Sequence, residues 1–291
     1  MIYRLLGAPW AGGHTQNPGY ASIDIFRKVM DLCPKISANF LRFNSGADFA
    51  RNPNWEFQNE LAKEMASRKL GAFIVYQDTR MSTERVQEVH DFWCDIYASC
   101  GLNPKTYIVA QDDNEPGFYG GGDRERNAPR DKEGVIPPER LADILRIARG
   151  LNTHGCLLAA PNIEAEKPES LARELAALNT LGDDLWLFDI LTFSCYWGRR
   201  QTSTEGVKWR TKQIKESALW GAREWPIVVA AEANREGGGA RDPGSEMTSI
   251  IANGGWLLGP GNLQGAGWFA GYDKFSPQFS MIPAKAVTPP K

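Results

Sequence analysis

The sequence has few cysteines and histidines, no cluster of basic residues and no long apolar run. Its 291 residues carry 33 Lys and Arg against 35 Asp and Glu, which gives a net charge of -2. Without a basic patch, nucleic acids and acidic membranes are poor partners. No apolar run approaches the roughly 18 residues of a membrane helix, and the N-terminal stretch MIYRLLGAPW lacks the pattern of a signal peptide. We therefore expect a cytoplasmic protein, or one that is released or associated with a virion.

The cysteines and histidines show no spacing that is typical of disulfides or metal sites. They are Cys33, Cys94, Cys100, Cys156 and Cys195, with His14, His90 and His154. An odd, scattered set of cysteines argues against a disulfide framework and against a zinc site. We expect free thiols, no bound metal and no organic cofactor.

Short apolar runs recur along the chain and alternate with segments of helical periodicity. The runs cover residues 2–6, 40–43, 72–76, 107–110, 156–160, 185–191, 227–231 and, less clearly, 265–270. Such near-continuous apolar runs are typical of parallel strands buried on both faces. The amphipathic segments cover residues 55–70, 83–100, 138–151, 170–181, 207–220 and 243–252.

Eight strands alternating with helices predict an α/β protein with a (β/α)8 TIM barrel. A doubly wound open sheet is the alternative, but no glycine fingerprint follows the first strand. No linker or second core is apparent, so we expect one domain over residues 1–291. The proline-rich tail after Phe275 has little helical periodicity, which predicts that the last outer helix is short or missing.

Two glutamates follow apolar strands of this predicted barrel. Glu115 lies in QDDNEPGFYG, directly after the fourth run, and Glu232 follows PIVVAA in the seventh. The carboxyl ends of the strands hold the chemistry of such barrels. Glycoside hydrolysis requires two carboxyl groups, one protonated and one ionised, on either side of the bond. We expect the neighbouring Asp112 or Asp113 to bond backbone or a nearby cation instead.

The tripeptide Asn114-Glu115-Pro116 after the fourth strand, Glu232 ending the seventh and Arg42 ending the second together resemble glycoside hydrolase clan A. Members of that clan are (β/α)8 barrels that cleave glycosides with retention of configuration. The resemblance implies a retaining glycosidase that acts on β-glycosidic bonds of an oligo- or polysaccharide, with a carbohydrate as its partner.

The resemblance also implies a role for individual residues. Glu115 would be the acid/base and Glu232 the nucleophile. Asn114 would bond the 2-hydroxyl of the sugar, Arg42 would keep the nucleophile ionised and Tyr196 would donate a hydrogen bond to it. Trp268 would form the floor under the sugar. Two further tryptophans at the predicted rim, Trp10 and Trp197, have flat faces that suit sugar rings.

Other interpretations of the same residues stay open. Glu115 can be the start of a solvated loop, Glu232 a structural partner of Arg42 or Arg235, and some of the ten tryptophans core residues. A barrel of the same ancestry that binds glycans without cleaving them, as a cell-surface or virion component, is the first alternative function. An aldolase or isomerase is the second, but the predicted strand ends carry no lysine for a Schiff base.

Overall fold

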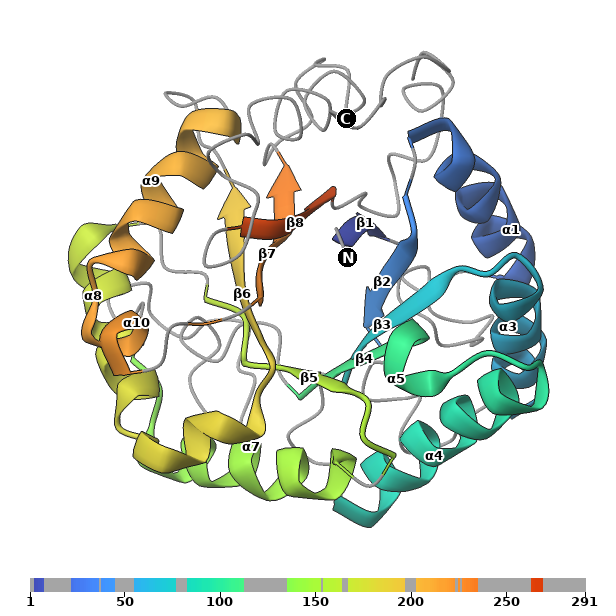
Figure 1. Cartoon of the computed structure of the whole chain (residues 1–291), viewed down its shortest axis with the longest axis horizontal. Helices are drawn as coiled ribbons and strands as arrows, with labels where there is room; N and C mark the ends of the chain where they lie inside the picture. Colours follow the sequence, from blue (N-terminus) through green and yellow to red (C-terminus); the bar gives the residue numbers. More distant parts are fainter. Residues whose placement is uncertain are drawn as a thin grey trace.

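Eight parallel strands close into a barrel in chain order, each strand pairing with the next and β8 pairing with β1 (Figure 1). The computed structural model describes residues 3–7, 22–36, 38–44, 55–76, 83–112, 135–152, 154–163, 167–196, 203–222, 225, 227–234 and 263–268. The strands are β1 Tyr3–Gly7, β2 Phe40–Asn44, β3 Gly71–Val75, β4 Ile108–Gln111, β5 Leu157–Ala159, β6 Ile190–Tyr196, β7 Ile227–Asn234 and β8 Leu263–Trp268. The predicted TIM barrel is therefore confirmed.

Seven predicted strands overlap the observed ones closely, but the sixth is shifted. The apolar run 185–191 was expected as a strand, whereas its first part belongs to the 3-10 helix η3 (Gly182–Leu187). Gly182 has a φ of 54°, a left-handed conformation that glycine adopts without steric cost, and it begins this turn. Leu185 in this turn is buried in the core. A short apolar run cannot by itself distinguish a buried turn from a buried strand.

Helices surround the strands (Figure 1). They are α1 Ile23–Leu32, α3 Trp55–Ser67, α4 Thr83–Ser99, α5 Pro104–Tyr107, α7 Pro138–Leu151, α8 Pro168–Asn179, α9 Ser203–Lys215 and α10 Ala218–Ala222. Neither α1 nor α5 was predicted, and the predicted helix 207–220 is divided into α9 and α10. The predicted helix 243–252 and the expected short or missing last helix lie outside the described residues. Within the described part of the chain, no helix is both long enough and apolar enough to cross a bilayer.

Among the residues that the structure describes, two separate groups of buried side chains stabilise the barrel. The larger group lies between the strands and the helices and includes Trp93 and Phe193. The smaller group fills the barrel interior and consists of strand residues: Leu5, Phe40, Phe73, Val75, Val109, Ala159 and Ile190. Because side chains alternate along a strand, Arg42 and Gln111 lie two positions beyond Phe40 and Val109 and share their interior face. The apolar interior thus ends in polar residues on two strands.

Candidate active site at the strand ends

All eight strands are parallel and closed, so their carboxyl ends form one rim of the barrel. Glu232 lies near the end of β7, while Tyr196 and Trp268 are the last residues of β6 and β8. Only the backbone of these three residues is described. The remaining predicted residues, Glu115, Asn114, Trp10 and Trp197, lie outside the described part of the chain. Of the predicted site, Arg42 is the residue whose side chain the structure describes.

The backbone pairing of β7 changes register next to Glu232. Phe193 pairs with Ala230, but the following residue Ser194 pairs with Glu232, so the strand carries one extra residue at this point. Irregularities of this kind bend a strand and are frequent beside active sites. This part of the rim therefore has the backbone feature that commonly accompanies a functional side chain.

Arg42 belongs to a buried polar network inside the barrel. Its Nη2 donates to Oε1 of Gln111 at 3.3 Å. Its guanidinium carbon lies 5.7 Å from the centre of the Phe73 ring, within the range of a cation–π contact. With 3% of its surface exposed, Arg42 is a positive charge held at the end of the apolar interior. Such a charge stabilises a nearby carboxylate.

Gln111 holds this network together across three further strands. Its Nε2 donates to the backbone oxygen of Ala160 at 2.6 Å and to Oγ1 of Thr192 at 2.7 Å. The Thr192 hydroxyl donates to the same Ala160 oxygen at 3.3 Å. The amide oxygen of Gln111 therefore contacts β2, and its amide nitrogen contacts β6 and the residue after β5. No role was predicted for Gln111 or Thr192, although the sequence shows a glutamine directly after the apolar run 107–110.

Asp112, the residue after β4, forms a buried ion pair with Arg140 of α7. Arg140 Nη2 lies 3.4 Å from Asp112 Oδ2, and both side chains are almost fully buried. The expectation that Asp112 bonds a neighbouring cation is confirmed. Removing one partner of a buried pair leaves the other charge uncompensated, which typically costs about 3–5 kcal/mol. The pair therefore fixes the chain at the start of the segment that leads to Glu115.

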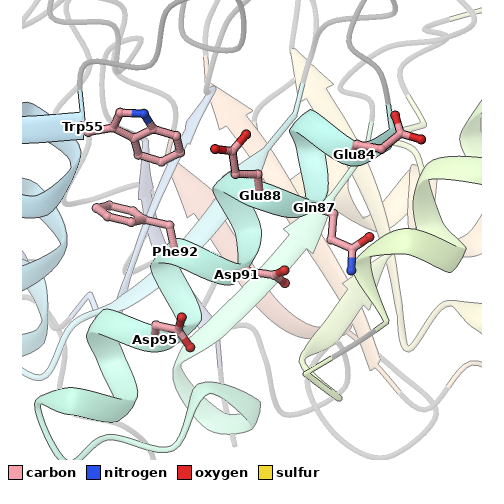
Figure 2. A pocket seen from close by; sticks show the side chains of 7 residues that line it. All are labelled: Trp55, Glu84, Gln87, Glu88, Asp91, Phe92 and Asp95. Atoms are coloured by element: carbon pink, nitrogen blue, oxygen red, sulfur yellow. The ribbon is translucent and has the colours of Figure 1, made fainter.

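A second feature, a groove of about 500 Å³, lies between α3 and α4 in the helical layer (Figure 2). Two aromatic rings line it, Trp55 and Phe92, with ring centres 4.8 Å apart. The other lining residues are Glu84, Gln87, Glu88, Asp91 and Asp95, all on α4. None of these residues belongs to a strand, so the groove is separate from the residues predicted for catalysis. Four carboxyl groups on one helix favour cations over anions.

Among the residues that the structure describes, one group has the composition of a metal site: His90, Cys94 and Cys156. It lies between α4 and the start of β5 and contains none of the residues predicted for the rim. This group was not predicted, because Cys156 is 62 residues from Cys94 in the chain. The four-residue spacing of His90 and Cys94 on a predicted helix was the available indication.

No protein-family model and no curated protein sequence matches the chain. Solved structures do match its fold. An endo-β-1,4-glucanase from Xanthomonas axonopodis pv. citri has a TM-score of 0.58 at 10% identity, over 97% of this chain and 99% of its own. An exo-β-1,4-mannosidase from the Opitutaceae bacterium strain TAV5 has a TM-score of 0.53 at 13% identity, over 92% and 52%. A GH51 arabinofuranosidase from Xanthomonas axonopodis pv. citri has a TM-score of 0.51 at 11% identity, over 92% and 66%.

The chain is similar to these solved structures in fold. At such low sequence identity, the roles of individual residues cannot be carried over from them. The shared barrel does agree with the resemblance to clan A. The chain shares its architecture with glycosidases that act on several different sugars.

Proposed function

We propose that the chain is a retaining glycoside hydrolase, with residues 1–291 forming one catalytic barrel and a carbohydrate as substrate. The bond that it cleaves is a β-glycosidic bond of an oligo- or polysaccharide. Glu115 is the general acid and base, and Glu232 is the nucleophile. Neither carboxylate needs a metal ion for this chemistry.

The observation that carries this proposal is the closed parallel barrel with Glu232 at the end of β7 and Glu115 three residues beyond Asp112. Closure brings the carboxyl ends of β4 and β7 to one rim, although the two strands are not neighbours. A retaining glycosidase needs its two carboxyl groups about 5–5.5 Å apart, on opposite sides of the scissile bond. Glu232 near the end of β7 and Glu115 shortly after β4 fit this requirement.

In the first step Glu115 protonates the leaving oxygen while Glu232 attacks the anomeric carbon, which gives a covalent glycosyl-enzyme. In the second step Glu115 removes a proton from water, and that water displaces Glu232 with a second inversion. The two inversions together retain the configuration.

The other predicted residues support these steps in the proposal. Arg42, a buried cation on β2, keeps Glu232 ionised between turnovers. Tyr196 donates a hydrogen bond to the same carboxylate.

The remaining predicted residues contact the substrate in the proposal. Asn114 binds the 2-hydroxyl of the sugar. Trp268 forms the floor under the sugar. Trp10 and Trp197 stack on neighbouring rings.

The test is a hydrolysis screen on mixed β-linked polysaccharides and aryl β-glycosides, with the wild type, Glu115→Gln and Glu232→Gln. The matched control is Glu169→Gln, which changes an exposed glutamate in the first turn of α8. We expect both rim variants to lose activity and the control to keep it. NMR of the first product should show the β-anomer.

Other outcomes would overturn the proposal in distinct ways. An α-anomer as first product indicates inversion, with water as the attacking group. Binding of glycans without any hydrolysis indicates the non-catalytic barrel. If Glu115→Gln and Glu232→Gln are as active as the control Glu169→Gln, the two glutamates have no part in the mechanism.

A further inference from the structure

Three side chains with metal-binding atoms meet in the layer between α4 and the barrel. His90 and Cys94 lie one helical turn apart on α4, and Cys156 immediately precedes β5. Their ligand atoms all lie within 4.8 Å of one another. All three side chains are buried, with exposed fractions of 0%, 1% and 3%. The proposed glycosidase chemistry uses none of them.

Two of the three distances between these ligand atoms are close to those found around one small ion. Cys94 Sγ lies 3.4 Å from Cys156 Sγ and 3.7 Å from His90 Nε2. Tetrahedral zinc with bonds of about 2.3 Å to sulfur and 2.0–2.1 Å to nitrogen separates its ligand atoms by about 3.5–3.8 Å. A disulfide would need its sulfurs at about 2.05 Å. Both cysteines are free thiols at this separation.

A second contact orients the imidazole. The hydroxyl of Tyr76, the residue after β3, lies 3.3 Å from His90 Nδ1. A hydrogen on Nδ1 can donate to this oxygen, which leaves the Nε2 lone pair facing the cysteines. Histidine ligands of metals are commonly held in this way by a partner on the other ring nitrogen. The arrangement therefore supplies both a ligand set and its orienting group.

The charges also fit a divalent ion. Binding of the ion would displace the thiol protons of Cys94 and Cys156, because cysteine binds a metal as the thiolate. Two thiolates, a neutral imidazole and Zn²⁺ sum to zero charge, whereas Cu⁺ would leave a buried negative charge.

The acidic groove lies near the cluster, and Asp91 and His154 link the two. Asp91 lines the groove and its Oδ1 lies 2.8 Å from His154 Nε2. The His154 ring is 6.0 Å from the His90 ring. The side chains of Asp91 and His154 are both about one-third exposed. The carboxyl groups along α4 would attract a cation to the groove.

We propose that His90, Cys94 and Cys156 bind one Zn²⁺ ion that joins α4 to the start of β5. The ion is structural, because its ligands lie between α4 and the start of β5 and none of them takes part in the proposed glycosidase chemistry. It ties together positions separated by 62 residues of chain. This inference is independent of the glycosidase proposal.

The test uses the full chain, reduced and stripped with a strong chelator. Zn²⁺ is titrated in competition with a chromophoric chelator, and Co²⁺ is titrated separately to detect thiolate-to-cobalt charge-transfer absorption. We expect one ion per chain with a Kd below about 1 µM, a charge-transfer band, and a Tm that rises with the zinc concentration. Tyr76→Phe should weaken binding about 10- to 100-fold through the loss of the orienting contact.

Cys94→Ala and Cys156→Ala should lose the charge-transfer band and the zinc-dependent rise in Tm. Cys33→Ala is the matched control, because it also removes a buried thiol but lies outside the cluster. It should be less stable than the wild type and still bind one ion. Circular dichroism verifies that each variant is folded.

Four results would overturn the proposal. The wild type could show no stoichiometric Zn²⁺ binding, or the Cys94 and Cys156 variants could bind as the wild type does. Binding of Cu⁺ under argon without binding of Zn²⁺ would exclude zinc as the ion. A Cys94–Cys156 disulfide in protein that binds no metal after reduction would identify a redox pair instead.

Discussion

Arg42 and Gln111 meet inside the barrel, with Arg42 Nη2 3.3 Å from Gln111 Oε1, although 69 positions separate them in the chain. The contact joins β2 to β4 across β3. It places a buried positive charge and its neutral partner at the rim where the proposed chemistry occurs.

Gln111→Met should destabilise the fold by about 2–4 kcal/mol, because it keeps the approximate shape but leaves Arg42, Thr192 and the Ala160 oxygen with one partner fewer each. Turnover should also fall, since Arg42 loses its orienting partner. Urea unfolding and kcat measure the two effects. Gln58→Met is the control, because Gln58 is equally buried but accepts one bond, from Trp93, outside the barrel interior. Gln58→Met should lower the unfolding free energy by less than Gln111→Met does, and it should leave kcat unchanged. An equal effect of both variants on kcat would contradict a role for Gln111.

The roles of the two glutamates can be separated with azide. In Glu232→Ala, azide should restore turnover of a β-glycoside by attack from the vacated side and give the α-glycosyl azide. Glu115→Ala should slow glycosides with poor leaving groups by about 10²–10⁴-fold, and should spare activated ones in the first step. Azide should then give the β product. The opposite stereochemistry in the two variants would exchange the roles of Glu115 and Glu232.

Gly71 at the start of β3 has no room for a side chain. A Cβ at this position would overlap ring atoms of Phe40, its neighbour on β2. Gly71→Ala should therefore lower the free energy of unfolding by about 1–3 kcal/mol, as measured by thermal or urea unfolding. The second substitution Phe40→Leu in the same chain should recover part of that loss. Gly221→Ala is the control, since a Cβ there meets no atom within 4 Å. An unchanged free energy of unfolding in Gly71→Ala would show that the barrel wall adjusts more easily than its packing indicates.

The stability of the fold should depend on pH through Glu64 of α3. Burial disfavours its charge, but hydrogen bonds from Arg27 and Arg68, each 2.9 Å long, outweigh burial and lower the pKa of Glu64. A carboxyl whose pKa is lower in the folded chain stabilises the fold above its unfolded pKa of about 4.3. That contribution is lost as the pH falls through the folded pKa.

Glu64→Gln should thus lower the unfolding free energy at pH 6–7, and the difference from the wild type should shrink as the pH falls below about 4. Urea unfolding at several pH values measures this. Glu216→Gln serves as a control, because Glu216 is exposed and its one described cation, Lys212, is 3.9 Å away. A difference that stays constant with pH would show that the two arginines do not act through the charge of Glu64.

The sequence by itself determined the repeating unit of this protein. Seven of the eight strands follow from apolar runs such as 72–76, and α7 was predicted with both of its observed ends, because strand and helix periodicities are local properties of the chain. The two glutamates were also visible as carboxylates that follow apolar strands. The predicted sixth strand was shifted, since an apolar run that fills a buried turn has the same composition as a strand.

Tertiary structure alone decided which distant side chains meet. Barrel closure brings Arg42 to Gln111, and the packing of α4 against the sheet brings His90 and Cys94 to Cys156. Hydrogen bonds and metal ligation depend on separations of a few ångströms. Sequence periodicity gives the face of an element on which a residue lies, but the separation between two elements is set only when the whole barrel packs together.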